Sequence, residues 1–324
     1  MSKFLVHLWN HTKEGIRSLE DVVGIWGHQL RALGHEVVWD PDNTILNGKV
    51  QFVTGEDTYN VIVEGFTPTI VDIIGKAKET TGAKFICLAT EEPTEKGFNH
   101  GTQKEMVWRQ ETFGPAMDHF EGILHLVPGK AVSDWYSQYL PTAYVELGYA
   151  PTFIRGERYP EPPFDVGFYG SVTPRRLHLL KRLAKRIGTP RAVRLMADFQ
   201  EQEKRDAVVQ EAKIIVQIRK FDEMGLVSSS RCNTALSCGR PVVAEAHDEA
   251  LSKPWDTIVK FSRNEEDFIN NVLLALPRWR ALHRHQFERF RTMLTPEVCT
   301  GHALHKIGIT EHPEGYAKDF RKAA

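Results

Sequence analysis

Short apolar runs alternate with longer amphipathic stretches along the chain. Residues 3–9 form an apolar run of strand type, and residues 16–33 carry a helical stripe of apolar side chains that ends at Gly34. Gly34 lies where a helix end favours a left-handed residue, and residues 35–39 then begin another extended segment. This order predicts a strand, a helix and a second strand, the βαβ unit from which parallel sheets are built.

The same alternation continues on both sides of a proline-rich segment, residues 149–165, whose prolines disfavour both helix and central strand. Before this segment the pattern predicts a helix at 68–79 and strands at 59–65, 83–90, 122–127 and 142–148. After it the pattern predicts strands at 165–171, 192–197, 213–219, 241–246 and 257–262. Helices are expected at 174–187, 201–212, 228–239 and 265–294. The sequence therefore predicts an α/β fold of two Rossmann-like, doubly wound domains in tandem, 1–155 and 156–324, with a cleft between them.

Composition and charge narrow the class of protein. The chain has 324 residues, 41% of them hydrophobic and 26% charged, so two folded, water-soluble domains are the first expectation. Its formal net charge is -1, so a polyanion or a membrane surface would have to be bound by a local patch. The first apolar run is short, and no later run approaches the roughly 18 residues of a membrane-spanning helix. We therefore expect a cytoplasmic protein without a membrane span.

The cysteines Cys87, Cys232, Cys238 and Cys299 show no CxxC spacing. Such a distribution favours buried, apolar thiols over a zinc site or a disulfide framework. The sequence therefore gives no sign of a structural metal.

The strongest candidate binding site follows the first strand after the linker. That strand ends at Gly170-Ser171, and the next helix opens near Pro174 with Arg175 and Arg176 in its first turn. A helix N-terminus exposes free backbone N–H groups and a partial positive charge, and both attract an anion. Two arginines there oppose the helix dipole unless a phosphate or carboxylate meets them. We therefore expect an anionic ligand; the alternative is a tight turn at Gly170 beside two solvated arginines.

A second candidate lies after the third strand of this half. A serine triplet there can cap a helix beside free backbone amides, and the residue after it adds a cation in the first turn. A carboxylate ends the strand that follows, and it suits a ribose or sugar diol. The residues of this candidate are Ser228, Ser229, Ser230, Arg231, Asn233 and Glu245. A serine cap beside a surface Arg231–Glu245 pair is the alternative.

Several of these segments resemble the GT-B glycosyltransferases. CGRPVVAE at 238–245 resembles the C-terminal half of that fold, and VGFYGSVTPRRLHLLKRL at 166–183 resembles its opening in CgeB-like and bacterial group 1 enzymes. HQLRALGHEVVW at 28–39 resembles the first helix and second strand, and residues 127–151 resemble the approach to the linker. The resemblance spans most of residues 3–262. It implies a nucleotide-diphosphate sugar, expected to be UDP-linked, on the C-terminal domain and an acceptor on the N-terminal one.

Within this resemblance the chain departs from the group 1 pattern at two places. Gly170-Ser171 stands where the family usually has Gly-Arg, and Arg176 corresponds to its basic residue further along. The paired-glutamate motif of the family would fall on Leu226 and Thr234, and it is absent. The resemblance therefore implies phosphate binding by Arg176 and Arg231, while retention or inversion at the sugar stays open.

The acceptor side offers rival general bases. His11 follows the first strand, where several inverting GT-B enzymes carry a base, and histidine with a pKa near 6.5 takes up a proton at neutral pH. Glu91 or Glu92, after the strand at 83–90, is the rival, and Glu92 is our choice of the two. Asn99 and His100 lie between glycines in a loop suited to contact the acceptor. For each of them, an ordinary loop residue is the alternative.

Residues 277–293 interleave arginines with Trp279, Phe287 and Phe290. This pattern suits a phosphate backbone with stacked bases. It suits equally a helix with one face packed on the domain and an arginine-rich face in water. We favour the packed helix. A nucleic-acid acceptor is kept as an alternative that the pattern does not favour.

These observations favour a glycosyltransferase that moves a sugar from a nucleotide-diphosphate sugar to a hydroxyl acceptor, without a metal or other cofactor. Arg176, Arg231 and the amides of the serine triplet would stabilise the departing diphosphate, where negative charge grows most. The alternatives are a nucleotide-sugar epimerase on the same fold, a DNA-modifying glycosyltransferase and a non-catalytic nucleotide-sugar-binding protein.

Overall fold

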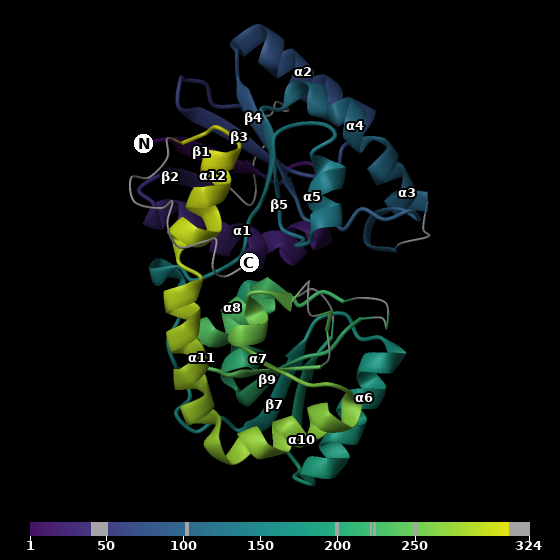
Figure 1. The fold of residues 1–324 in the computed structure, drawn as a ribbon, viewed down its shortest axis with the longest axis vertical. Coiled ribbons are helices and arrows are strands. Elements are labelled where there is room, and N and C mark those ends of the chain that lie inside the picture. The colour runs from purple at the N-terminus through teal and green to yellow at the C-terminus, as the bar shows by residue number, and fades with distance from the viewer. Residues whose placement is uncertain are drawn as a thin grey trace. The chain divides into compact units, whose positions relative to one another are not determined.

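The computed structural model describes residues 1–39, 51–100, 104–197, 201–220, 222, 225–245, 247–248 and 252–310. These residues contain two parallel sheets, one of six strands and one of five, with helices packed against them (Figure 1). The predicted α/β class is therefore confirmed. The chain separates into two compact units: the first unit is Met1–Leu5, Phe52–Val145 and Glu297–Ala324, and the second unit is Val6–Gln51 and Glu146–Pro296.

The six-stranded sheet has the strand order β2-β1-β3-β4-β5-β6. Its strands are β1 (Lys3–His7), β2 (Glu36–Trp39), β3 (Thr58–Val63), β4 (Lys84–Ala89), β5 (Gly122–His125) and β6 (Thr142–Tyr144). In β3, β4 and β5, Ile62 lies opposite Cys87, and Cys87 lies opposite Ile123. These three strands are buried almost throughout, as expected for parallel strands that are covered on both faces.

The helices in the first half of the chain begin and end where the sequence supplies caps. The Thr12 hydroxyl caps α1 by accepting a hydrogen bond from the Gly15 amide at 3.2 Å, and Thr67 caps α2 in the same way. Gly82 follows the last residue of α2, and its φ of 69° is left-handed, a conformation that residues with a side chain rarely adopt. The helical elements before the linker are α1 (Lys13–Ala32), α2 (Pro68–Thr81), η1 (Phe98–His100), α3 (Lys104–Glu111), α4 (Phe113–Ala116), η2 (Met117–His119) and α5 (Lys130–Tyr136). Two more, η6 (Glu297–Gly301) and α12 (His302–Lys306), follow the helices of the second sheet.

The five-stranded sheet belongs to the second unit and has the strand order β11-β10-β9-β7-β8. Its strands are β7 (Phe164–Tyr169), β8 (Val193–Met196), β9 (Ala212–Gln217), β10 (Val242–Ala244) and β11 (Lys260–Phe261), all paired in parallel. β7 lies beside β9 although the chain passes through β8 between them, so the strand order reverses here. Doubly wound sheets bind ligands outside the carboxyl ends of their strands at such a switch point.

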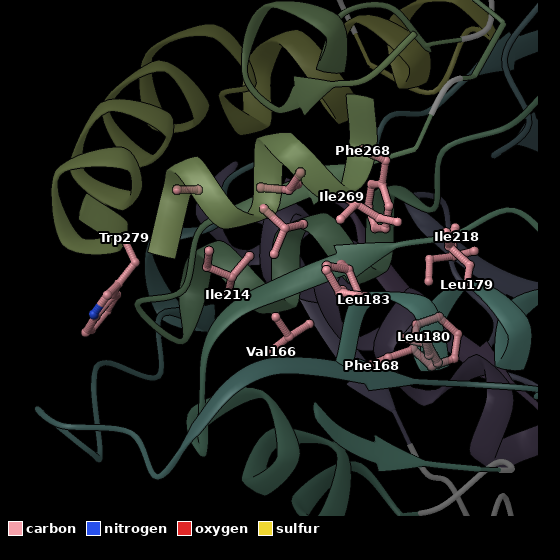
Figure 2. Close-up of a cluster of buried hydrophobic side chains, with 14 residues drawn as sticks. Val166, Phe168, Leu179, Leu180, Leu183, Ile214, Ile218, Phe268, Ile269 and Trp279 are labelled. Carbon is pink, nitrogen blue, oxygen red and sulfur yellow. The ribbon is translucent and has the colours of Figure 1, made fainter. Parts of the chain in front are cut away.

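Helices cover both faces of the five-stranded sheet. Its helical elements are α6 (Pro174–Ile187), α7 (Gln202–Gln210), α8 (Ser229–Ser237), η4 (Trp255–Thr257), α10 (Glu265–Ala275), η5 (Leu276–Arg278) and α11 (Trp279–Met293). On one face, β7 and β9 pack against α6 and α10 in an apolar cluster that includes Phe168, Leu183 and Phe268 (Figure 2). Because successive residues of a strand point to opposite faces, the neighbours of Phe168 in β7 point to the other face.

The opposite face of the sheet carries α7 and α8. At Gly167 of β7, a Cβ would lie 2.7 Å from Ile215 Cδ1 of the neighbouring β9 and 3.3 Å from the Val208 carbonyl of α7. Only glycine fits this close approach. Gln217 of β9 donates to the Ser228 carbonyl at 2.9 Å, which fixes the start of α8. The end of β7, the end of β9 and the start of α8 therefore meet on this face.

Most predicted elements are confirmed to within a few residues, and α6 is confirmed at both ends. Helices α3, α4, α5 and α12 were not predicted, because with eight residues or fewer they are too short for a helical period to emerge. The predicted linker holds only η3 (Pro151–Phe153) before β7 begins. The four cysteines are buried and free. In the part of the chain that the structure describes, no helix is both long and apolar enough to cross a bilayer.

The arginine-rich segment at 277–293 folds mainly as α11. Trp279 and Phe290 are buried. Arg280 lies over the Trp279 ring at 4.4 Å and pairs with Glu161 at 2.7 Å. The aromatic residues of this segment therefore serve packing, as the packed-helix interpretation expects.

Candidate functional site

A cavity of 160 Å³ lies at the switch point of the five-stranded sheet, and we call it the switch-point cavity. Its walls come from the end of β7, the start of α8, α7 and α1, all within the second unit. The lining residues are Ser18, Asp21, Tyr169, Gly170, Arg205, Ser228, Ser230 and Arg231. The structure thus brings together four of the predicted site residues, and a wall of polar and charged side chains suits a polar ligand.

Arg231 extends across the end of β7. Its Nη1 donates to Gln217 Oε1 at 2.5 Å, and its guanidinium lies 5.3 Å from the centroid of the Tyr169 ring. The Nε atom is buried without a hydrogen-bond partner. Burial lowers the pKa of Arg231 from its usual value, so an anion beside it would stabilise the charged form. Gly170 leaves room for this arrangement, since a Cβ there would lie 3.0 Å from Arg231 Nη2.

The N-terminus of α8 borders the same cavity. Ser228 is its N-cap: the Oγ accepts from the Arg231 amide at 3.4 Å and lies 3.2 Å from the Ser230 hydroxyl. Ser229 does not line the cavity, and its hydroxyl accepts from the Trp255 indole at 3.1 Å. The first amides of a helix have no partner within the helix and carry partial positive charge. This end of α8 therefore adds to the positive field of Arg231.

The remaining lining residues were not predicted from the sequence: Ser18 and Asp21 of α1, Tyr169 of β7 and Arg205 of α7. Asp21 Oδ2 accepts from Arg205 Nε at 2.9 Å, and this buried ion pair joins α1 to α7. Asp21 Oδ1 and the Tyr169 hydroxyl are buried without a hydrogen-bond partner. One signal was available, since Tyr169 directly precedes Gly170.

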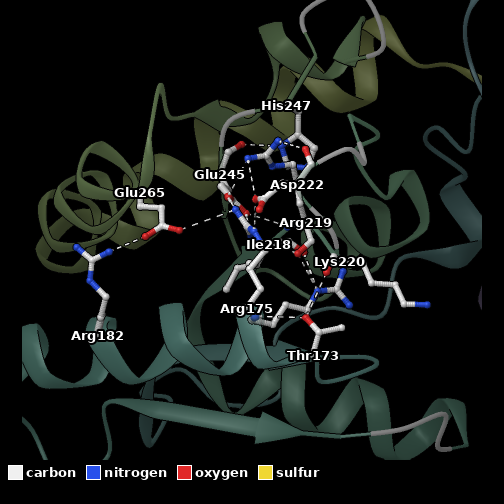
Figure 3. A network of polar contacts seen from close by, with 11 residues as sticks. Thr173, Arg175, Arg182, Ile218, Arg219, Lys220, Asp222, Glu245, His247 and Glu265 are labelled. Atoms are coloured by element: carbon white, nitrogen blue, oxygen red, sulfur yellow. Dashed lines mark hydrogen bonds and ion pairs between the residues drawn. The ribbon is translucent and has the colours of Figure 1, made fainter. Parts of the chain in front are cut away.

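Arg175 and Glu245, both predicted site residues, bind each other (Figure 3). Arg175 Nη1 donates to Glu245 Oε2 at 2.9 Å, Nη2 contacts Oε1, and Nε donates to Asp222 Oδ1 at 2.6 Å. Glu245 is 1% exposed and also accepts from the Arg219 amide at 2.9 Å. The hydrogen bond to Glu245 raises the pKa of Arg175. The pair ties the start of α6 to the end of β10, and neither residue lines the switch-point cavity.

Arg176 is buried and holds the loop that follows β7. Its Nη1 donates to the Ser171 carbonyl at 2.8 Å, and its Nε donates to the Ile218 carbonyl at 3.0 Å. Burial, with the charge of Arg231 nearby, lowers the pKa of Arg176 to about 9. The guanidinium therefore positions the ends of β7 and β9 in this structure and does not line the switch-point cavity.

Asn233 is fully buried inside α8. Its Nδ2 donates to the carbonyls of Leu147 and Gly148, at 3.1 Å and 2.5 Å, and its Oδ1 accepts from the Ser237 hydroxyl at 3.0 Å. Both ends of the amide are thus used to fix α8 to the segment before the linker. In this structure Asn233 has a positioning role and does not line the switch-point cavity.

In the first unit, buried polar contacts fix the loop after β4. Glu64, directly after β3, is 1% exposed, and its two carboxylate oxygens contact the backbone N–H and the hydroxyl of Thr90. Burial, followed by the negative charge of Glu91, raises the pKa of Glu64 to about 8. Glu64 was not among the predicted site residues, although it is the one charged residue in the strand predicted at 59–65.

Asn99 fixes the same loop from its other end. With a left-handed φ of 56°, it accepts from the Glu92 amide at 2.9 Å and donates its own amide to the Glu92 carbonyl at 2.7 Å. Glu91 contacts Asn99 Nδ2 and pairs with Arg109 Nη1 at 3.0 Å. Glu91 is thus held by an amide and a cation, while Glu92 is half-buried. The side chain of His100 lies outside the described residues.

His11 lies in the turn before α1, in the second unit. Its backbone amide donates to the Leu8 carbonyl at 3.0 Å, and its half-buried ring lies close to the first turn of the helix, with Nδ1 3.6 Å from where a Cβ on Gly15 would be. Glu92 belongs to the first unit. Among the described residues, no three His, Cys, Asp or Glu side chains are grouped closely enough to hold a metal ion.

Comparison with solved structures identifies the fold. Over 95% of this chain and 99% of the other, the structure is similar to Anabaena HepE, solved in complex with UDP-glucose, with a TM-score of 0.57 and 10% identity. Trehalose-6-phosphate synthase from E. coli, bound with UDP-2-fluoro glucose, gives a TM-score of 0.54 and 8% identity over 96% of this chain and 100% of the other. Both neighbours are GT-B glycosyltransferases. This chain has the GT-B fold.

Two further comparisons give matches over part of a chain. TarM gives a TM-score of 0.50 and 12% identity over 78% of this chain, which spans 55% of the TarM chain. No family model matches the sequence. The uncharacterized protein L140 of Acanthamoeba polyphaga mimivirus is 27% identical over 144 residues, which are 41% of this chain and 45% of that protein. The chain thus matches about half the length of these two relatives.

Proposed function

We propose that this protein is a glycosyltransferase that moves a sugar from a UDP-linked donor to a hydroxyl acceptor. The observation that carries the proposal is the switch-point cavity, where Arg231 lies beside the N-terminus of α8. The two phosphates of such a donor are anionic, and a guanidinium next to free helix amides suits their charge. The shared fold with HepE, solved with UDP-glucose, supports this choice of donor.

The reaction requires charge stabilisation where the donor breaks. The bond from the anomeric carbon to the diphosphate oxygen breaks, the acceptor oxygen bonds to that carbon, and the acceptor hydroxyl loses its proton. Negative charge grows on the diphosphate, and Arg231 with the α8 amides would stabilise it. Hydrogen-bond donors that are held in place before the reaction need no reorganisation when the charge develops. Arg231 is such a group, since its Nη1 donates to Gln217 Oε1 at 2.5 Å. We propose that Arg231 and the α8 amides supply the positive charge that this step requires, so that no metal or other cofactor is needed.

We assign the other predicted residues supporting roles. Arg176 holds Ser171 and the end of β9, so it shapes the wall that Gly170 and Arg231 occupy. The Arg175–Glu245 pair fixes the start of α6 in the same way. A donor that displaced this pair would free Glu245 for a ribose or sugar diol.

We propose that the acceptor is bound mainly by the domain of residues 1–155, and the donor mainly by the domain of residues 156–324. His11 or Glu92 would take the proton of the acceptor hydroxyl. Within the GT-B enzymes we place the chain beside the CgeB-like and bacterial group 1 proteins, and we propose that it acts in the cytoplasm.

Binding of UDP tests the donor assignment directly. In isothermal titration, Arg231→Ala should raise the Kd for UDP roughly 10- to 100-fold, because a charge-assisted contact is lost. Arg263→Ala is the matched control, since that side chain is 89% exposed and should leave the Kd unchanged. Failure of the wild type to bind UDP, or equal losses in the two variants, would contradict the proposal.

Product analysis separates the proposal from its alternatives. With UDP-glucose and a mixture of hydroxyl acceptors, a glycosylated acceptor supports transfer. An epimerised UDP-sugar formed without acceptor would assign an epimerase, and saturable binding without turnover would assign a binding protein. Salt-sensitive binding to duplex DNA would favour a DNA-modifying transferase.

A further inference from the structure

The switch-point cavity combines two kinds of polar chemistry. On the α8 side, Arg231 and the capped helix start are donors of positive character. On the α1 side stands Asp21, the one carboxylate among the lining residues. A phosphate at neutral pH suits the first side and is repelled by the second.

Only one of the two carboxylate oxygens of Asp21 accepts a hydrogen bond. The residue is 6% exposed, and its Oδ2 accepts from Arg205 Nε at 2.9 Å. Its Oδ1 is buried and forms no hydrogen bond. Arg205 is engaged elsewhere too, since its Nη1 donates to the Arg17 carbonyl at 2.9 Å. A buried acceptor left unpaired is costly in free energy, so a ligand that supplies a donor here gains affinity.

Tyr169 adds a second incomplete group to the cavity. The residue is 6% exposed. Its hydroxyl is buried and has no hydrogen-bond partner, and the same holds for the Thr234 hydroxyl nearby. Burial raises the pKa of Tyr169, so the phenol stays neutral and can both donate and accept. Asp21, in contrast, can only accept.

The ligand that completes these groups must therefore carry hydroxyls next to an anion. A carboxylate oxygen needs a hydrogen-bond donor, which a fully ionised phosphate does not have. The volume of 160 Å³ is well below the roughly 300 Å³ at which pockets for drug-sized ligands begin, so it receives one part of a ligand. A sugar hydroxyl next to the donor's phosphate meets both conditions.

We infer that Asp21 determines donor specificity by accepting a hydrogen bond, through Oδ1, from a hydroxyl of the transferred sugar. The inference rests on the proposed function and deepens it, because it separates recognition of the sugar from recognition of the diphosphate. Arg231 and the start of α8 bind the diphosphate, and Asp21 binds the sugar.

The Asp21→Asn variant replaces the hydrogen-bond acceptor at the position of Oδ1 with a donor. Arg205 Nε requires an acceptor, so the amide oxygen of the variant takes the place of Oδ2. The amide NH₂ then occupies the place of Oδ1 and offers donors where the wild type offers an acceptor. Asp267→Asn, the same change in α10 outside the cavity, is the matched control.

Titrations with UDP, UDP-glucose and its four monodeoxyfluoro analogues, substituted at C2, C3, C4 or C6, test the inference. Fluorine cannot donate a hydrogen bond. In the wild type and in Asp267→Asn, one analogue should bind about 10- to 100-fold more weakly than UDP-glucose. In Asp21→Asn that difference should disappear, while the Kd for UDP stays within about twofold.

The outcomes separate the two claims. Absence of UDP binding to the wild type would overturn the proposed function and this inference with it. Normal UDP binding with all four analogues equal to UDP-glucose would overturn the inference alone, and so would an equal loss of UDP and UDP-glucose affinity in Asp21→Asn. Because the analogue series uses the wild type, it can overturn the inference even if the variant does not fold.

Discussion

The Arg231 guanidinium lies beside Gly170 at the end of β7, against the position that a side chain of residue 170 would occupy. Gly170 has a φ of 123°, and the point where its Cβ would stand lies 3.0 Å from Arg231 Nη2. The strand thus ends in a residue without a side chain, and a guanidinium from α8 fills the room. The contact joins the two elements that border the switch point, so it couples the backbone of β7 to the cation of the switch-point cavity.

Gly170→Ala should weaken UDP binding more than it weakens the fold. The new methyl group displaces the Arg231 guanidinium, and we expect a rise in the Kd for UDP of roughly tenfold or more. The positive φ adds a cost of about 1–3 kcal/mol to folding. Isothermal titration measures the first effect, and urea unfolding measures the second.

Gly188→Ala is the control for the backbone effect. Gly188 ends α6 with a φ of 73°, and no heavy atom lies within 4 Å of its Cβ position. This variant should lose stability through the same kind of strain while it keeps its affinity for UDP. If the two variants bound UDP equally well, Arg231 would not depend on Gly170.

Glu245→Gln should destabilise the protein. It leaves Arg175, whose side chain is 18% exposed, facing a neutral amide where it now has a bidentate carboxylate. Loss of one partner of a buried ion pair costs about 3 kcal/mol. Urea unfolding should show that loss, whereas Asp222→Asn, at a carboxylate that is 78% exposed, should leave the free energy of unfolding close to that of the wild type. A variant of full stability with impaired UDP binding would instead assign Glu245 to the donor.

Local signals explain why the fold was predictable. Helix α6 is predictable at both ends because its boundaries are local: Thr173 caps it, Pro174 occupies its first turn and Gly188 ends it. Helix α5, with seven residues and no side-chain cap, carries no such signal. The switch point itself depends on which strands pair, and a strand's partners do not appear in its own sequence.

The candidate site was only partly predictable, because its side chains meet across long stretches of chain. The sequence placed Gly170 and Arg231 in two candidate sites, one after each of two strands, and the structure brings these two residues together. Asp21 lies in the middle of a helix, where nothing local distinguishes it from a solvated residue. Asn233 shows the converse, since its place after the serine triplet suggested a ligand, while its amide bonds the carbonyls of Leu147 and Gly148.

Glu64 should give the free energy of unfolding a distinctive dependence on pH. In the unfolded chain its pKa is close to the ordinary value of 4.5, and burial raises it to about 8 in the folded protein. Between these values the folded protein keeps a proton that the unfolded chain has released. The stability that Glu64 contributes is therefore fully present below pH 4.5 and is lost as the pH rises to about 8, by up to about 1.4 kcal/mol per pH unit.

Glu64→Gln should remove this dependence. Glutamine matches the shape of the protonated carboxyl, and it can accept from the Thr90 amide while it donates to the Thr90 hydroxyl. Urea unfolding at pH 5 and at pH 8 should therefore show little difference between variant and wild type at the lower pH, and a more stable variant at the higher pH. Glu95→Gln, at an exposed residue of the same loop, should follow the wild type at both. Parallel curves for Glu64→Gln and the wild type would mean that Glu64 is already ionised in the folded protein, with Arg109 compensating its charge.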